Sequence, residues 1–123
     1  MDFKIDTKDT FTVITPTYTT INAKLADDLA VKCEEIRQNG SKNFIIDLQH
    51  ATSLDKDGIE AFITLHEECY SSEESLVLTG INPELIKTLS DEEHDALNIT
   101  PRMIEAVDII SMEILERDLL SEE

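Results

Sequence analysis

The sequence predicts an α/β domain built around a central mixed β-sheet of about five strands, with about four helices. Three observations indicate this fold class. In the second half of the chain, short β-branched and apolar runs alternate with helical patterns, which implies crossover connections and parallel pairing. Near the N-terminus, two strand-like runs flank a short turn, which is typical of an antiparallel hairpin. The 123 residues suffice for one core, and no linker or repeat divides them.

The first two strands are expected at residues 3–6 and 11–15, where aromatic and β-branched residues gather. The polar residues 7–10 between them predict the turn of the hairpin. Pro16 is expected to end the second strand, because proline has no backbone N–H for a sheet ladder. Residues 17–21 are then predicted to form a connection.

The first helix is predicted over residues 23–38, with Asn22 as its N-cap and Asn39-Gly40 as its C-terminal stop. Its expected apolar face consists of Leu25, Leu29, Cys33 and Ile36. The next strand is expected at residues 44–46. This run, Phe-Ile-Ile, is continuously apolar, as in a strand that is buried on both faces of a sheet.

A second helix is predicted to follow the acidic turn at residues 55–58. The helical spacing suggests that it buries a stripe made of Ile59, Phe62, Ile63, His66 and Tyr70. The polar residues 71–74 are expected to break this helix. Residues 76–78 form the next predicted strand, and Gly80 turns the chain.

The last third of the chain is predicted to hold two helices and one weak strand. Asn82-Pro83 is a strong helix start, and the helix that follows presents Leu85, Ile86 and Leu89. Residues 91–93 are interpreted as a solvated bend and residues 97–100 as the strand. Pro101 is expected to open the final helix, which runs to about Leu120 and uses Met103, Ala106, Val107, Ile110 and Ile114. The domain is thus expected over residues 1–120, with a short acidic tail at residues 121–123.

Composition and charge narrow the possible functions. The formal net charge is −17, from 27 acidic and 10 basic residues, so the surface repels nucleic-acid phosphates and anionic lipids. Basic protein partners are favoured, although a solvated acidic surface without a partner is an open alternative. No apolar run approaches the roughly 18 residues of a membrane span, and the N-terminus lacks a secretory signal pattern. Cys33 and Cys69 are expected to be free buried thiols of a cytoplasmic protein.

Three stretches resemble the STAS domain, the family of the bacterial anti-sigma factor antagonists and of related domains in transporters and stressosomes. Residues 44–59 look like the strand, loop and Asp-Ser-Ser/Thr-Gly-Leu turn of that family. Residues 81–89 resemble the stretch in which a proline opens the third helix. Residues 20–22, followed by residues 26–29, resemble the entry to the first helix. The order β-β-α-β-α-β-α-β-α completes the likeness over nearly the whole chain.

The resemblance implies a binding module that displaces a sigma factor from a kinase-like anti-sigma factor. In such proteins the first hydroxyl of the turn is phosphorylated, and the added charge of roughly −1.5 to −2 disrupts the interface. In this chain Lys56 stands at that position and Asp57 at the next one, so the usual switch is expected to be lost. Asn22 also replaces an acidic residue often found near the turn. Ser53, or Thr52 beside it, is a possible substitute phosphosite.

Asp57 has two possible roles. Its charge could imitate the phosphorylated form, or it could cap and charge the start of the helix, where an acid contributes roughly 0.3–1 kcal/mol. We favour the second role. Lys56 then becomes a point of specificity that faces a carboxylate of the partner.

Sites for metals or catalysis find little support in the sequence. Asp55-x-Asp57 with Gly58 suggests a calcium loop only superficially, because the twelfth position holds His66 instead of glutamate. His66 and Cys69 lie three residues apart, but no second pair completes a metal site. There is no nucleophile elbow and no glycine-rich phosphate loop. We therefore expect no metal, no cofactor and no enzymatic activity.

The resulting hypothesis is a cytoplasmic protein-binding module resembling an anti-sigma factor antagonist. Its expected partner is an anti-sigma factor or kinase-like ATPase, with no nucleic acid bound and no insertion into a membrane. The alternative is an accessory subunit that docks on an ABC-type lipid transporter. The predicted partner-binding residues are Asn22, Asp55, Lys56, Asp57, Gly58, Glu60, Thr64 and Glu67.

Overall fold

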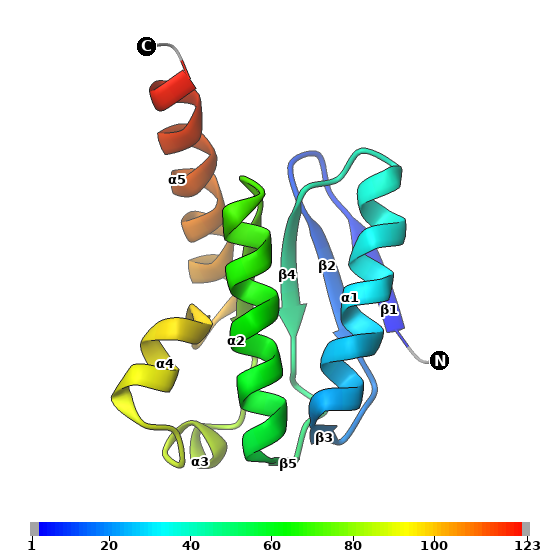
Figure 1. Ribbon diagram of the computed structural model, residues 1–123, viewed down its shortest axis with the longest axis vertical. Helices are drawn as coiled ribbons and strands as arrows, with labels where there is room; N and C mark the ends of the chain where they lie inside the picture. Colours follow the sequence, from blue (N-terminus) through cyan, green and yellow to red (C-terminus); the bar gives the residue numbers. More distant parts are fainter. Residues whose placement is uncertain (1–2, 122–123) are drawn as a thin grey trace.

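A five-stranded mixed sheet forms the middle layer of the fold, with the strand order β1-β2-β4-β6-β7 (Figure 1). The computed structural model describes residues 3–121. The strands are β1 (Phe3–Thr7), β2 (Thr12–Pro16), β4 (Asn43–Asp47), β6 (Ser75–Thr79) and β7 (Ile99–Thr100). β1 and β2 pair antiparallel as the predicted hairpin, and all the other neighbours pair parallel. The predicted α/β fold with a mixed sheet is confirmed.

Helices cover both faces of this sheet. The helices α1 (Ala23–Gln38) and α2 (Lys56–Ser71) lie on one face, and α5 (Met103–Ser121) lies on the other (Figure 1). The strand β4 explains how both layers are held: Phe44 and Ile46 pack in the core beneath α1 and α2, whereas Ile45 packs against α5. All three side chains are fully buried, as the continuous apolar run predicts.

The predicted first helix is confirmed at both ends. Asn22 is the N-cap, and its Oδ1 accepts a hydrogen bond from the backbone N–H of Leu25 at 2.9 Å. Asn39 is the C-cap, and Gly40 follows with a positive φ of 101°. Leu25, Leu29 and Cys33 of the predicted apolar face are buried.

The predicted buried stripe of α2 is partly wrong. Ile59 and Phe62 are buried, but His66 is half-buried and Tyr70 is 60% exposed. The buried face continues instead through Leu65 and Cys69. Both stripes start from the same residues and fit helical spacing, so periodicity alone could not separate them. Packing of α2 against α1, α4 and β6 decides between them.

The predicted bend at residues 91–93 is instead the first turn of a helix, α4 (Asp91–Leu97). A capping box starts it: Ser90 Oγ accepts from the N–H of Glu93 at 3.1 Å, and Glu93 Oε1 accepts from the N–H of Ser90 at 2.9 Å. Acidic residues in the first turn also stabilise the positive end of the helix dipole. The acids that suggested a solvated bend therefore help the helix to form.

The remaining boundaries shift by a few residues. The predicted helix at Pro83 is a single turn, α3 (Pro83–Ile86). Leu97 belongs to α4, and Asn98 ends that helix with a positive φ of 53°, so only the last two residues of the predicted strand form β7. α5 begins two residues after Pro101 and includes Ser121, while residues 122–123 of the predicted tail lie outside the described residues.

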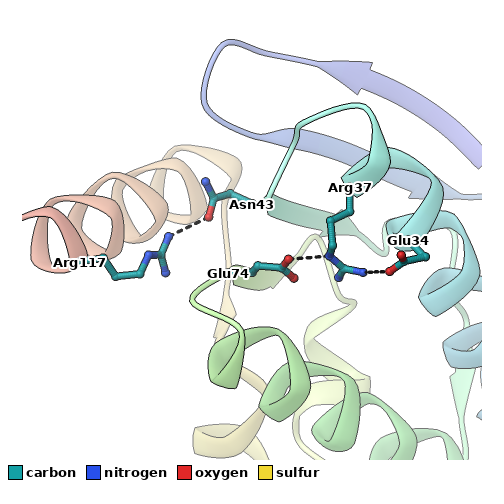
Figure 2. A network of polar contacts seen from close by, with 5 residues as sticks. All are labelled: Glu34, Arg37, Asn43, Glu74 and Arg117. Atoms are coloured by element: carbon teal, nitrogen blue, oxygen red, sulfur yellow. Dashed lines mark hydrogen bonds and ion pairs between the residues drawn. The ribbon is translucent and has the colours of Figure 1, made fainter. Parts of the chain in front are cut away.

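A polar network joins the elements at one end of the sheet (Figure 2). Arg37, in the last turn of α1, donates to Glu74 Oε2 at 2.6 Å and to Glu34 Oε2 at 2.5 Å. The hydrogen bond to Glu74 raises the pKa of Arg37 above its ordinary value, so this guanidinium is always charged. Nearby, Arg117 of α5 donates to Asn43 Oδ1 at 2.9 Å. The network therefore ties the ends of α1 and α5 to the starts of β4 and β6.

Among residues 3–121, no helix combines the length and the apolar content that crossing a membrane would require.

Candidate protein-binding site at the start of helix α2

A second, two-stranded sheet supports the starts of α1 and α2. It pairs β3 (Thr20–Ile21) with β5 (Ser53–Leu54) in parallel, at the end of the molecule where both helices begin (Figure 1). The N–H of Asp55 extends the ladder by donating to the carbonyl of Ile21 at 3.0 Å. The predicted connection at residues 17–21 is therefore wrong for its last two residues. Strands this short carry no measurable periodicity, so the sequence did not indicate them.

Asp55 is the N-cap of α2. Its Oδ1 accepts a hydrogen bond from the N–H of Gly58 at 2.7 Å, and its carbonyl accepts from the N–H of Ile59 at 3.1 Å. Of the two roles proposed for Asp57, capping thus belongs to Asp55. Asp57 lies in the first turn, where its charge faces the positive end of the helix dipole.

Gly58 lies where α2 meets the loop that leads into α1. A Cβ atom at Gly58 would lie 2.4 Å from the carbonyl oxygen of Ile21 and 2.5 Å from Cα of Asn22. Both contacts are with backbone atoms, which a side-chain rotation cannot move. The structure therefore brings Asn22 and the 55–58 turn together, and only glycine allows their close approach.

Lys56 and Asp57 are exposed on this rigid turn. Neither side chain has a hydrogen bond or ion pair within residues 3–121. The predicted contact residues Glu60, Thr64 and Glu67 are exposed as well. Their spacing of four and three residues places them on one face of α2, which continues from the turn along the helix.

An open groove lies beside the turn and has a volume of about 490 Å³. Its lining combines apolar and polar side chains from β5, α2 and the α3–α4 region: Thr52, Ser53, Leu54, Lys56, Ile59, Leu85, Thr88, Leu89 and Glu93. Sequence reasoning missed this groove, because it forms only where segments distant in the chain meet. Its only signal was the apolar set Leu85, Ile86 and Leu89 after Pro83, which the structure shows as half-buried.

The two possible substitute phosphosites lie at the edge of the groove. Both residues are exposed, and their hydroxyls have partners in β3 or directly before it. Ser53 Oγ lies 3.0 Å from Thr20 Oγ1, and Thr52 Oγ1 donates to the carbonyl of Thr19 at 3.3 Å. These contacts attach the loop before α2 to the loop before α1.

The cysteines and His66 do not form a reactive centre. Burial raises the pKa of Cys33 to about 12 and that of Cys69 to about 11, so both remain protonated thiols at neutral pH. Within the part of the chain that the structure describes, no group of three or more His, Cys, Asp or Glu residues could hold a metal ion.

His66 gives the protein a pH-dependent stability. Burial lowers its pKa in the folded state, below the value of about 6.5 that an unfolded chain has. As the pH falls, His66 is therefore protonated first in the unfolded state, which stabilises that state. The free energy of unfolding that His66 contributes above about pH 6.5 is lost below this pH. The variant His66→Gln should show a shallower fall in the free energy of unfolding between pH 7.5 and pH 5.

Urea denaturation at several pH values measures this effect. His50→Gln is the matched control, because His50 is exposed. A pH profile of His66→Gln that coincides with that of the unmodified protein would show that His66 is equally easy to protonate in both states.

Comparisons with known proteins agree with this architecture. The family described as the STAS domain matches residues 3–108 of the chain. A search of curated proteins finds no match.

Among solved structures, the chain is similar to the protein TM1081 of Thermotoga maritima, with a TM-score of 0.73 and 17% identity over 90% of each chain. It also resembles the anti-sigma factor antagonist SpoIIAA in its unphosphorylated form, with a TM-score of 0.63 and 15% identity over 89% of this chain and 96% of that one. An anti-sigma factor antagonist from Mycobacterium paratuberculosis gives a TM-score of 0.65 and 13% identity over 89% and 92% of the two chains. At these identities the likeness concerns the fold.

Proposed function

The chain belongs to the STAS domain family, and we propose that it is a protein-binding regulatory module that acts like an anti-sigma factor antagonist. In this proposal its contact surface consists of the 55–58 turn, the neighbouring Asn22 and the exposed face of α2 with Glu60, Thr64 and Glu67. The partner is an anti-sigma factor or a kinase-like ATPase.

The observation that carries the proposal is the pair Lys56 and Asp57, which are exposed on the turn and have no hydrogen-bond or ion-pair partner in the described part of the chain. A partner can contact both groups without breaking any bond inside this protein, and the turn needs no rearrangement, which lowers the entropic cost of binding. In this surface Lys56 would face a carboxylate of the partner. The net charge of −17 favours approach by basic proteins.

We also propose that the usual phosphorylation switch has been lost. Lys56 cannot accept a phosphate from a serine kinase, and the following position offers a carboxylate instead of a hydroxyl. Binding would then be controlled by the amounts of the partners, or through another hydroxyl such as that of Ser53.

The binding surface can be tested by affinity capture from native lysate with the variants Lys56→Glu and Lys42→Glu. Both variants change the charge equally, and both lysines are exposed and without a partner among residues 3–121. Lys42, however, precedes β4 at the opposite end of α1 from Asn22. We expect the unmodified protein and Lys42→Glu to retain a kinase-like ATPase, and Lys56→Glu to lose it.

Two results would count against the proposal. If both variants captured equal amounts of the ATPase, Lys56 would not be part of the interface. Recovery of a transporter subunit, with no kinase-like partner in any sample, would instead support the alternative of a transporter accessory subunit.

The lost switch needs a separate measurement. After incubation with the captured ATPase and ATP, intact mass should show a phosphate on the variant Lys56→Ser and none on the unmodified protein. A phosphate on the unmodified protein would show that the switch has moved, and fragmentation would then distinguish Ser53 from Thr52.

A further inference from the structure

Helix α5 carries apolar side chains on two sides, and the residues that the structure describes cover one of them. Ala106 and Ile110 are fully buried against the sheet. On the outer side, four large apolar side chains are exposed by 57–65% of their surface: Ile104, Met112, Leu115 and Leu119. We call these four residues the outer stripe. A helix with two apolar faces is typical of an element that is covered on both sides.

The spacing makes the C-terminal part of the outer stripe continuous, whereas exposed Asp108 and Ser111 separate Ile104 from it. Met112, Leu115 and Leu119 follow one another at intervals of three and four residues, so they share one face of the helix. Ile104 lies eight residues before Met112, slightly more than two turns away on the same side. This is the pattern of anchor positions by which one helix packs lengthwise on another.

The orientation of α5 is fixed, so the outer stripe cannot turn toward the core. Arg117 points to the sheet, where it donates to Asn43 Oδ1 at 2.9 Å (Figure 2). It also donates to Ser75 Oγ at 3.1 Å. Ser75 Oγ also donates to Glu113 Oε1 at 2.5 Å. These contacts hold the C-terminal half of the helix, which extends past the ends of α1 and α2 in Figure 1.

The charges beside the outer stripe are acidic. Asp108 and Glu116 are exposed on the same side of the helix, and Arg117 is the only basic residue within α5. Because Arg117 is directed to the sheet, its charge does not offset these acids at the outer stripe. A second copy of the chain would bring the same acids, and a net charge of −17, against this surface. Charge therefore favours a basic occupant.

We propose that the outer stripe binds a basic amphipathic helix of a partner protein. Apolar residues of that helix pack along Met112, Leu115 and Leu119, and its lysine or arginine side chains pair with Asp108 and Glu116. This surface lies on the opposite side of the sheet from α1 and α2, so it is separate from the surface around the 55–58 turn. The protein can thus contact two partners, or two parts of one partner, at the same time.

A synthetic peptide of 18 residues tests the proposal. It contains leucine at helical spacing on one face and lysine elsewhere, and its affinity for the full chain is measured by fluorescence anisotropy. Two control peptides separate the contributions: one has the same composition in scrambled order, and the other replaces each lysine with glutamate. We expect binding of the first peptide to be at least about tenfold tighter than that of either control.

The matching protein variants are L115Q/L119Q and V31Q/Y70Q. All four side chains are exposed by 57–60%, but Val31 and Tyr70 lie on α1 and α2. We expect L115Q/L119Q to weaken binding of the basic amphipathic peptide roughly tenfold or more, and V31Q/Y70Q to leave it within about twofold. Because every substituted side chain is exposed, thermal unfolding should remain unchanged in both variants.

Four outcomes would overturn the proposal. Equal binding of the scrambled peptide would show that charge alone accounts for the binding. Equal binding of the glutamate peptide would exclude a basic occupant. Unchanged affinity in L115Q/L119Q would place the peptide elsewhere. Sedimentation of the protein alone gives the fourth outcome: a dimer that L115Q/L119Q dissociates would show that a second copy covers the outer stripe.

Discussion

Replacing Gly58 with alanine should lower the free energy of unfolding by about 3 kcal/mol, at the upper end of the usual cost of overpacking. The new Cβ would lie 2.4 Å from the carbonyl oxygen of Ile21 and 2.5 Å from Cα of Asn22, so α2 and the loop before α1 must separate. In a helix without this contact, the same substitution would stabilise by roughly 1 kcal/mol, because alanine is the better helix former. Urea denaturation followed by circular dichroism measures the difference.

Asp57→Ala is the control for this prediction, since Asp57 is exposed in the same helical turn. It should change stability by no more than about 0.5 kcal/mol. If Gly58→Ala were as stable as Asp57→Ala, the approach of α2 to Asn22 would be looser than the structure indicates. The proposed binding surface would then lack its rigid support.

Replacing Arg37 with methionine should also cost about 3 kcal/mol, because it leaves the buried carboxylate of Glu74 without its charge partner. The Glu74 side chain is only 5% exposed, and the distance from Arg37 Nε to its Oε2 is 2.6 Å. Within residues 3–121 the other carboxylate oxygen, Oε1, is buried without a hydrogen-bond partner. Thermal and urea unfolding of Arg37→Met measure the loss.

Two further variants separate two possible causes of the stability loss: the unpaired charge of Glu74 and the removal of an arginine as such. Arg102→Met removes the partner of Glu105 in an exposed ion pair and should cost less than about 1 kcal/mol. The double variant R37M/E74M removes both charges and should recover most of the stability that Arg37→Met loses. A double variant as unstable as Arg37→Met would show that packing of the arginine, including its place 5.7 Å above the Phe44 ring, matters more than its charge.

The sequence predicted those parts of the fold that local patterns encode. The hairpin, the first helix with its Asn22 cap and the doubly buried run at Phe44 all depend on neighbouring residues, and the structure confirms them. The stripe of α2 and the helix α4 were mistaken for different reasons. For α2, the choice between Tyr70 and Leu65 depends on which helices pack against it. For α4, the sequence contains the capping box of Ser90 and Glu93, but its acidic residues also fit a polar bend, so the helix was not predicted.

The candidate site was predictable only as a turn. The pattern Asp-Lys-Asp-Gly indicated the start of a helix, and the structure shows Asp55 as its cap. The close approach of Gly58 to Asn22 and the pairing of β3 with β5 join segments about thirty residues apart, and no local signal encodes such contacts. Whether Asn22, Lys56 and the exposed residues of α2 bind a partner remains a prediction for the capture experiment.

The way the 55–58 turn is held has a consequence for how such a module evolves. Its shape depends on the cap at Asp55, the glycine at position 58 and the backbone of the β3–β5 pair, whereas the side chains at positions 56 and 57 make no hydrogen bond or ion pair within residues 3–121. Substitutions at those two positions should therefore cost little in folding, no more than about 0.5 kcal/mol each. The chemistry that this surface offers at positions 56 and 57 can thus change while the architecture of the domain stays intact.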